Sequence, residues 1–136
     1  MAGPVTPASL GLLDTSVVID TPRDLSRFAV SVGVAAVTVG ELAFGLHVAD
    51  PIASAEREQR YRDILATYDP VPYDAAAAHW YGAIAAAVRR EGRNPRPRMG
   101  DLTIAATARS VGAVVLTRNP RDFKGLDGIV EVVAIL

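Results

Sequence analysis

The sequence predicts a single three-layer α/β domain whose sheet is mainly parallel. Short apolar segments alternate with segments of helical periodicity along the chain of 136 residues, as in parallel strands joined by crossover helices. Half of the residues are hydrophobic and 21% are charged, which is an ordinary globular composition. A chain of this length has room for one core, so we expect one domain over residues 1–136, with the start, residues 1–8, flexible.

The first half of the chain contains two expected strands and a helix that leads away from the second. Residues 10–14 form an apolar strand that ends in Asp14, where the chain turns at once into a helix start. A short helix is expected over residues 24–28, and the Val-rich residues 29–37 are typical of a buried parallel strand. A helix then begins at Thr38 and ends near residue 49, because Asp50 precedes a proline.

The second half continues the alternation of helices and strands. Charged pairs at i,i+4 spacing indicate an exposed helix over residues 53–66. Asp74 caps an Ala-rich helix, and Asp101 opens a helix that is apolar on nearly all sides and therefore buried. The Ala-rich helix is expected to end near residue 91 and the buried helix at Gly112. We expect an edge strand or an extended link at residues 68–72, and strands at residues 113–117 and 129–133.

The bulk composition excludes several classes of protein. The chain has no cysteine, so it contains no disulfide, no thiolate zinc site and no thiol nucleophile. A net charge of −1 provides no global basic field, so nucleic-acid binding would need a local patch. The sequence shows neither a signal peptide nor an apolar segment long enough to span a membrane. We therefore expect a cytoplasmic protein with no membrane partner.

Four acids lie at the junctions between the expected elements. Asp14 and Asp122 follow strands, whereas Glu41 and Asp101 lie in the first turns of helices. The carboxyl ends of parallel strands meet at one edge of a sheet, so these carboxylates can converge there. Converging carboxylates repel one another unless a cation neutralises them, and oxygen ligands favour Mg²⁺ or Mn²⁺. Because such an ion activates water and stabilises charge on a phosphate, the pattern indicates phosphodiester hydrolysis.

Each of these acids also has a purely structural explanation. Thr38 and Glu41 have the spacing of a capping box, and Asp101 would interact favourably with a helix dipole. Asp122 fits a turn. Capping alone explains Asp14 less well, because this acid ends a buried apolar strand. From spacing alone, both the metal site and the structural roles stay open.

Five arginines surround the end of the Ala-rich helix and the loop that follows it. They have the charge needed to bind phosphate groups of a nucleic acid or to contact an acidic partner. They equally suit the negative end of the helix dipole, where they would remain solvated. Both interpretations stay open. These residues are Arg89, Arg90, Arg93, Arg96 and Arg98.

Four blocks of sequence occur in a characteristic order and with characteristic separations from about residue 10 to the C-terminus. They are Leu-Leu-Asp14-Thr-Ser, Thr38-Val-Gly-Glu41-Leu, Gly-Asp101-Leu-Thr-Ile-Ala-Ala-Thr-Ala and Leu-Thr117-Arg-Asn-Pro-Arg-Asp122-Phe. Together they resemble the PIN-domain nucleases, and most closely the VapC-type toxins of toxin–antitoxin pairs. The resemblance implies a PIN-like α/β/α sandwich, Mg²⁺-dependent endoribonuclease activity, a cognate VapB-type antitoxin as inhibitor, and a homodimer.

The resemblance also assigns roles to individual residues. Asp14, Glu41 and Asp101 match the three acids that bind the metal in this family. Asn119 stands where many relatives have Asp, and Asp122 is the only acid in the last block, so the fourth position stays open between these two. Small polar residues that would orient the carboxylates or water are Thr15, Ser16, Thr117 and Asn119.

The function expected from these observations is RNA cleavage by a metal-activated water. Two other classes stay open. One is a catalytically inactive PIN-like module that acts with its antitoxin on nucleic acid, for which the departure at Asn119 is the main argument. The other is a Mg²⁺ phosphohydrolase of small phosphate esters, which the lack of an Asp-x-Asp motif around Asp14 disfavours.

Overall fold

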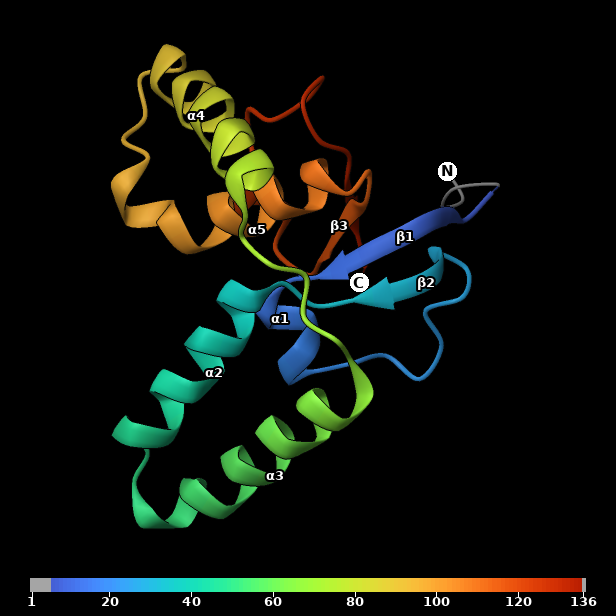
Figure 1. The fold of residues 1–136 in the computed structure, drawn as a ribbon, viewed down its shortest axis with the longest axis vertical. Helices are drawn as coiled ribbons and strands as arrows, with labels where there is room; N and C mark the ends of the chain where they lie inside the picture. Colours follow the sequence, from blue (N-terminus) through green and yellow to red (C-terminus); the bar gives the residue numbers. More distant parts are fainter. Residues whose placement is uncertain (1–5, 136) are drawn as a thin grey trace.

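The computed structural model describes residues 6–135, which form a four-stranded parallel sheet with helices on both faces (Figure 1). The strand order is β2-β1-β3-β4, so the two strands nearest the N-terminus lie beside the two strands nearest the C-terminus. In the register of the sheet, Leu12 lies opposite both Gly33 and Val115. The strands are β1 (Ala8–Leu13), β2 (Ala29–Gly33), β3 (Val114–Thr117) and β4 (Val132–Ala134).

Two hydrophobic clusters fill the two faces of the sheet. Leu12 and Val115 belong to the cluster beneath α4 (Ala75–Arg90) and α5 (Met99–Ser110). The next residues along these strands, Leu13 and Leu116, belong to the cluster on the opposite face. This division follows from the two-residue period of a strand, which sends neighbouring side chains to opposite faces. The predicted three-layer α/β domain with a parallel sheet is therefore confirmed.

Most expected elements are present, but their ends differ. The strand predicted over residues 29–37 ends at Gly33, because the backbone of residues 34–36 turns to pair with Val71 instead. The last strand begins at Val132 rather than at residue 129. The short helix expected over residues 24–28 is absent from the structure, where residues 24–25 are irregular and residues 26–28 form a turn.

The helices α2 (Ala36–Val48) and α3 (Pro51–Thr67) form a hairpin that extends away from the sheet (Figure 1). The start of α2 was predicted at Thr38, but its N-cap is Ala35, so Thr38 lies inside the first turn. The Thr38 hydroxyl is buried and has no hydrogen-bond partner among the described residues. The capping-box explanation for Thr38 and Glu41 is therefore wrong. Glu41, expected in the first turn, lies in the second turn of α2, because the helix begins two residues before Thr38.

The helices α4 and α5 pack against each other over the other face of the sheet. Asp74 caps α4 as predicted, accepting a hydrogen bond of 3.0 Å from the amide of Ala77. The interior of α5 is buried as predicted, and Gly112 follows it with a φ of 70°, a conformation that suits glycine. The other helices of residues 6–135 are short: α1 (Thr15–Ile19) after β1, η1 (Arg96–Arg98) before α5, and η2 (Pro120–Phe123) after β3.

The N-terminal segment was predicted to be flexible over residues 1–8. Residues 1–5 lie outside the described part of the chain, whereas Ala8 begins β1 and pairs with Ala29. The flexibility of this segment stays a prediction, as does the single domain over residues 1–136. Across residues 6–135, no helix combines the length and the apolar character that crossing a membrane requires.

Candidate metal centre

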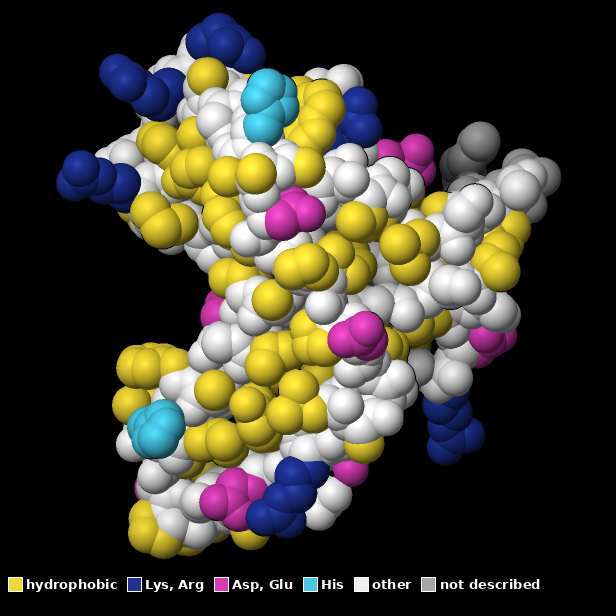
Figure 2. Space-filling model, viewed as in Figure 1, with side chains coloured by type: hydrophobic (Ala, Val, Ile, Leu, Met, Phe, Trp, Pro, Cys, Tyr) yellow, Lys and Arg dark blue, Asp and Glu magenta, His cyan; other side chains and the backbone are white. Residues whose placement is uncertain are grey.

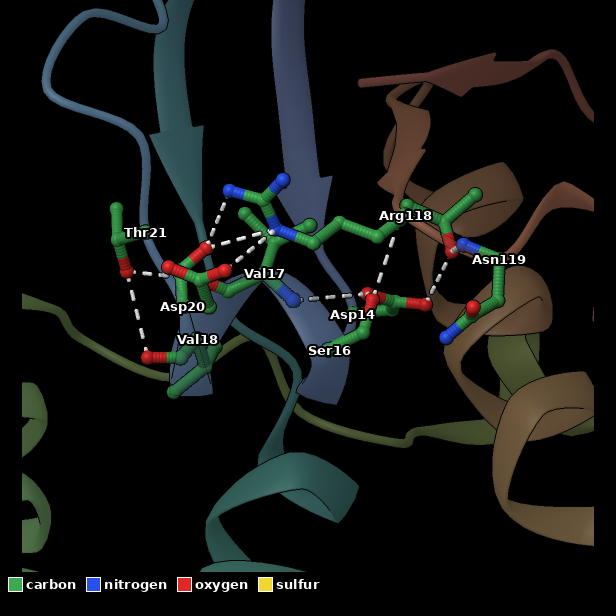
Figure 3. A network of polar contacts seen from close by, with 9 residues as sticks. Asp14, Ser16, Val17, Val18, Asp20, Thr21, Arg118 and Asn119 are labelled. Atoms are coloured by element: carbon green, nitrogen blue, oxygen red, sulfur yellow. Dashed lines mark hydrogen bonds and ion pairs between the residues drawn. The ribbon is translucent and has the colours of Figure 1, made fainter. Parts of the chain in front are cut away.

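Asp14 lies between β1 and α1, at the carboxyl edge of the sheet, and three donors hold its carboxylate (Figure 3). Oδ1 accepts hydrogen bonds from the Ser16 hydroxyl at 2.6 Å and from the Val17 amide at 3.2 Å. Oδ2 accepts one from the Thr117 hydroxyl at 2.5 Å. The residue is only 3% exposed, so these donors offset the cost of burying a charged group. Asp14 is both the N-cap of α1 and a fixed acid at the sheet edge.

The same contacts join the two halves of the chain at this edge. The Thr117 hydroxyl accepts a hydrogen bond of 2.9 Å from the Asn119 amide while it donates to Asp14. The Ser16 hydroxyl likewise accepts one of 3.2 Å from the Arg118 amide (Figure 3). Ser16 and Thr117 thus touch the Asp14 carboxylate directly, whereas Asn119 reaches it only through Thr117, by its backbone.

Glu41 reaches the site from α2. Its Oε1 accepts a hydrogen bond of 3.1 Å from the Thr15 hydroxyl of α1. Its Oε2 lies 3.4 Å from the place that a Cβ on Gly100 would occupy, so the carboxylate rests against the first turn of α5. Because Asp101 follows Gly100, this contact brings Glu41 next to the third acid. A glycine at this point gives the carboxylate room to approach the helix.

Asp101 lies in the first turn of α5 and is surrounded by the other three acids. Burial, first, and the negative charge of Asp122, second, raise its pKa from 3.8 to about 6. Asp14 and Glu41 add contributions of the same sign, and Arg98 opposes them. Asp101 accepts no side-chain hydrogen bond from the described residues. Among the four acids, Asp101 is therefore the one whose carboxylate has no hydrogen-bond or salt-bridge partner among the described residues and lies close to the other negative charges.

The four acids lie near one another without forming a closed ligand set. Within residues 6–135, no group of three or more Asp, Glu or His side chains is arranged so that it could hold one metal ion. Hydrogen bonds to hydroxyl groups hold Asp14 and Glu41, and like charges keep carboxylates apart. Binding one ion by several of these acids would therefore require small movements of the side chains.

Asp122 differs from the other three acids because it has a basic partner. It lies in η2, and its Oδ1 is 3.2 Å from Nη2 of Arg98. The same nitrogen donates a hydrogen bond of 3.2 Å to the carbonyl of Arg121. Within the described part of the chain, Asp14, Glu41 and Asp101 have no salt-bridge partner.

The five arginines predicted as a cluster divide into two groups in the structure. Basic side chains gather around the end of α4 (Figure 2), where Arg89 and Arg90 lie in the last turn. Arg89, Arg93 and Arg96 line one hollow of about 450 Å³. Arg98 alone turns towards the acids. The cluster therefore offers a basic surface around the end of α4 and one guanidinium, that of Arg98, at the candidate centre.

Arg118 contributes to the site although the sequence assigned it no role. Its guanidinium donates to the carbonyl of Asp20 from Nε at 2.9 Å and from Nη2 at 2.7 Å (Figure 3). Asp20 is the C-cap of α1, so Arg118 satisfies a carbonyl at the end of this short helix. The residue lies within the last of the four sequence blocks, but nothing in that block indicates a contact with residue 20.

Comparisons with known proteins agree with this architecture. The PIN-domain family model matches residues 11–129. A "tRNA(fMet)-specific endonuclease VapC" of Shigella flexneri is 33% identical over 127 residues, which cover 87% of this chain and 92% of that protein. "Ribonuclease VapC4" of Mycobacterium tuberculosis is 34% identical over 129 residues, covering 91% and 95%.

A solved structure shows the same fold. A crystal structure of VapBC-5 from Mycobacterium tuberculosis, a member of the VapBC family of toxin–antitoxin systems, aligns with a TM-score of 0.81 and 32% identity. The alignment covers 93% of this chain and 99% of that chain, which confirms the predicted PIN-like sandwich. This chain therefore belongs to the PIN-domain family, among the VapC-type proteins.

Proposed function

We propose that this protein is an endoribonuclease toxin that hydrolyses RNA phosphodiester bonds with Mg²⁺, or with Mn²⁺, bound by Asp14, Glu41 and Asp101. The observation that carries the proposal is the convergence of acids around Asp101, whose pKa is raised by burial and then by their negative charge. The ribonuclease and endonuclease names of the two VapC relatives support the choice of RNA as substrate. We place this activity in the cytoplasm.

The donor chemistry of the site fits a hard divalent cation. Carboxylate and hydroxyl oxygens are the ligands that Mg²⁺ prefers, and the site contains no softer donor, since the chain lacks cysteine. A cation would also offset both the burial and the like-charge repulsion that raise the pKa of Asp101. When bound, the ion supplies a water of lowered pKa and stabilises negative charge on the phosphate.

The chain's own residues have separable tasks around this ion. Hydrogen bonds fix the carboxylate of Asp14, so it would give the ion a rigid anchor. Thr15 orients the carboxylate of Glu41 towards α5. Asp101, which is free of hydrogen bonds from the described residues, is the best placed to accept a proton from the attacking water. The basic surface around the end of α4 would contact the RNA backbone.

A VapB-type antitoxin is the proposed protein partner. Apolar side chains lie at the surface of the α2–α3 hairpin (Figure 2). Among the large ones, Phe44 is 68% exposed, Val48 60% and Ile52 93%. Exposed apolar residues that lie together are typical of a surface that another protein covers. The crystal structure of VapBC-5 supports a partner of the antitoxin class. The homodimer implied by the sequence stays a prediction, which light scattering of the purified protein would test.

Cleavage of total cellular RNA by the purified, antitoxin-free protein tests the proposal. Reactions contain Mg²⁺ or EDTA, and wild type is compared with Asp101→Asn and with Asp69→Asn. Asp69 is an exposed acid that is not among the groups whose charge acts on Asp101. Asp101 is a better target than Asp14, because Asp14→Asn would replace one of two carboxylate oxygens that accept buried hydrogen bonds from Ser16, Val17 and Thr117.

The three functions that the sequence left open give different results in this assay. An RNase toxin produces discrete fragments with Mg²⁺ from wild type and Asp69→Asn, and none from Asp101→Asn or with EDTA. No cleavage by a folded wild-type protein favours the inactive binding module. Turnover of a chromogenic phosphate ester in the absence of RNA cleavage favours the phosphohydrolase.

A further inference from the structure

The ion pair between Arg98 and Asp122 joins two segments that border the acidic site. Arg98 ends η1, just before α5, and Asp122 lies in η2, 24 residues later. Nη2 of Arg98 lies 3.2 Å from Oδ1 of Asp122 and donates to the carbonyl of Arg121 at the same distance. The Arg98 side chain is 23% exposed and that of Asp122 is 43% exposed. The pair therefore lies at the rim of the site, where both groups are accessible to a ligand.

Asp122 is poorly suited to bind a metal while this pair is intact. The guanidinium compensates its negative charge, and a cation that used Asp122 as a ligand would have to compete with Arg98. The other three acids have no such competitor among the described residues. Asp122 thus differs from the acids that would hold an ion by its basic partner, although its charge still acts on Asp101.

Arg98 keeps donors that the protein does not use. A guanidinium has five N–H donors arranged in a planar fork, and only Nη2 donates to protein groups within the described part of the chain. Nε and Nη1 remain for a second acceptor. A phosphate matches this fork, because its oxygens accept two parallel hydrogen bonds from one guanidinium. Arg98 also acts electrostatically on Asp101, so its charge lies close to the candidate centre.

We propose that Asp122 is a positioning residue rather than a metal ligand, and that it holds Arg98 where the guanidinium contacts a phosphate of the RNA. This inference rests on the proposed function and adds a substrate-contacting residue to it. It also answers the question that the sequence left open about the fourth acid: neither Asp122 nor Asn119 binds the ion. The amide of Asn119 instead supports Thr117 by its backbone.

Metal binding gives the first test, with Mn²⁺ as the probe and no RNA present. Mn²⁺ is titrated into antitoxin-free wild type, Asp122→Asn and Asp101→Asn. Loss of one partly exposed charge at the rim is worth up to ~1 kcal/mol, so Asp122→Asn is expected to bind Mn²⁺ within about fivefold of wild type. Asp101→Asn is expected to bind Mn²⁺ more than about 100-fold more weakly than wild type. This loss is larger than the roughly 10–100-fold that follows from removing a residue that only supports a metal ligand. Equal losses in the two variants would overturn the proposal.

RNA binding and cleavage give the second test. Arg98→Met removes the fork while keeping most of the apolar stem, and Arg62→Met is the control, because Arg62 forms a remote pair with Glu58 at 3.5 Å. A hydrogen bond to a charged group contributes ~1.5–3 kcal/mol, so Arg98→Met is expected to lower kcat/KM by at least about tenfold. Its Mn²⁺ affinity should not fall. Asp122→Asn should act in the same direction but less strongly.

The double variant Arg98→Met/Asp122→Asn tests whether Asp122 acts through Arg98. If it does, the double variant cleaves no more slowly than Arg98→Met alone. Additive losses, or an Arg98→Met variant that matches Arg62→Met, would refute the positioning role. A wild type that cleaves no RNA would refute the proposed function only. The Mn²⁺ titration, and anisotropy of a short fluorescent RNA with wild type and Arg98→Met in EDTA, would still decide between the two roles of Asp122.

Discussion

Replacing Thr117 by Val tests the contact on which the position of Asp14 depends. The Thr117 side chain is fully buried at the end of β3, and its hydroxyl lies between the Asp14 carboxylate and the Asn119 amide. Valine has nearly the same shape and suits a strand, so the packing is preserved. The substitution removes the donor to Asp14 Oδ2 and the acceptor for the Asn119 amide. Any change in stability then reports on these two hydrogen bonds.

The expected loss follows from the charge and burial of Asp14. A hydrogen bond to a charged group contributes ~1.5–3 kcal/mol, and Asp14 is 3% exposed, so water replaces the lost donor poorly. The Asn119 amide is only partly buried and can turn to water, so it adds little. We therefore expect Thr117→Val to lower the free energy of unfolding by about 2–3 kcal/mol.

Thr117→Ser is the matched control, because it keeps the hydroxyl and removes one buried methyl group. Its expected cost is about 1 kcal/mol. Urea denaturation followed by circular dichroism, in EDTA, measures both variants against wild type. The valine variant should also lose RNA cleavage, since Asp14 is no longer fixed on the β3 side. Equal costs for valine and serine would refute a stabilising hydrogen bond between Thr117 and Asp14.

Three further predictions concern other parts of the molecule. The raised pKa of Asp101 means that the folded protein favours the protonated form of this carboxyl group. In the absence of metal, the contribution of Asp101 to the free energy of unfolding is therefore greatest below about pH 4 and is lost as the pH rises through about 6. Asp101→Asn in EDTA should therefore be more stable than wild type at pH 8, by roughly 1 kcal/mol after solvent screening, and equal to it at pH 4, as thermal denaturation would show. Phe44→Asp should abolish co-purification with the antitoxin while RNA cleavage is retained. Asp74→Ala should cost about 1 kcal/mol in urea denaturation without changing cleavage, because it removes only the cap of α4.

The sequence predicted the parts of the fold that depend on local pattern. The apolar strand before Asp14, the cap at Asp74 and the apolar α5 each carry their signal within a few neighbouring residues. The ends of β2 and α2 were missed because they depend on a distant partner: residues 34–36 pair with Val71. No local pattern near Thr38 indicates that pairing, so Thr38 was misread as a cap.

The candidate site divides in the same way. Asp14, Asp101 and Asp122 could be placed from the sequence because each lies close to a junction between elements, whereas Glu41 lies in the second turn of α2. The pairing of Arg98 with Asp122 could not, since the two residues meet only when η1 and η2 pack beside α5. The sequence therefore grouped Arg98 with the other arginines and Asp122 with the other acids. The contact of Glu41 with Gly100 was hidden for the same reason.

The proposed function requires that the protein cleaves RNA with a metal ion bound at these acids. The Mg²⁺ dependence of the cleavage rate in wild type and Glu41→Gln tests this requirement most directly. Glu41 is exposed and accepts one hydrogen bond, from Thr15, so its substitution perturbs the fold little. Cleavage by wild type should saturate with Mg²⁺, and Glu41→Gln should need at least about tenfold more Mg²⁺ for half of the maximal rate. Cleavage that persists in EDTA, or the same Mg²⁺ dependence in both proteins, would contradict a metal centre that includes Glu41.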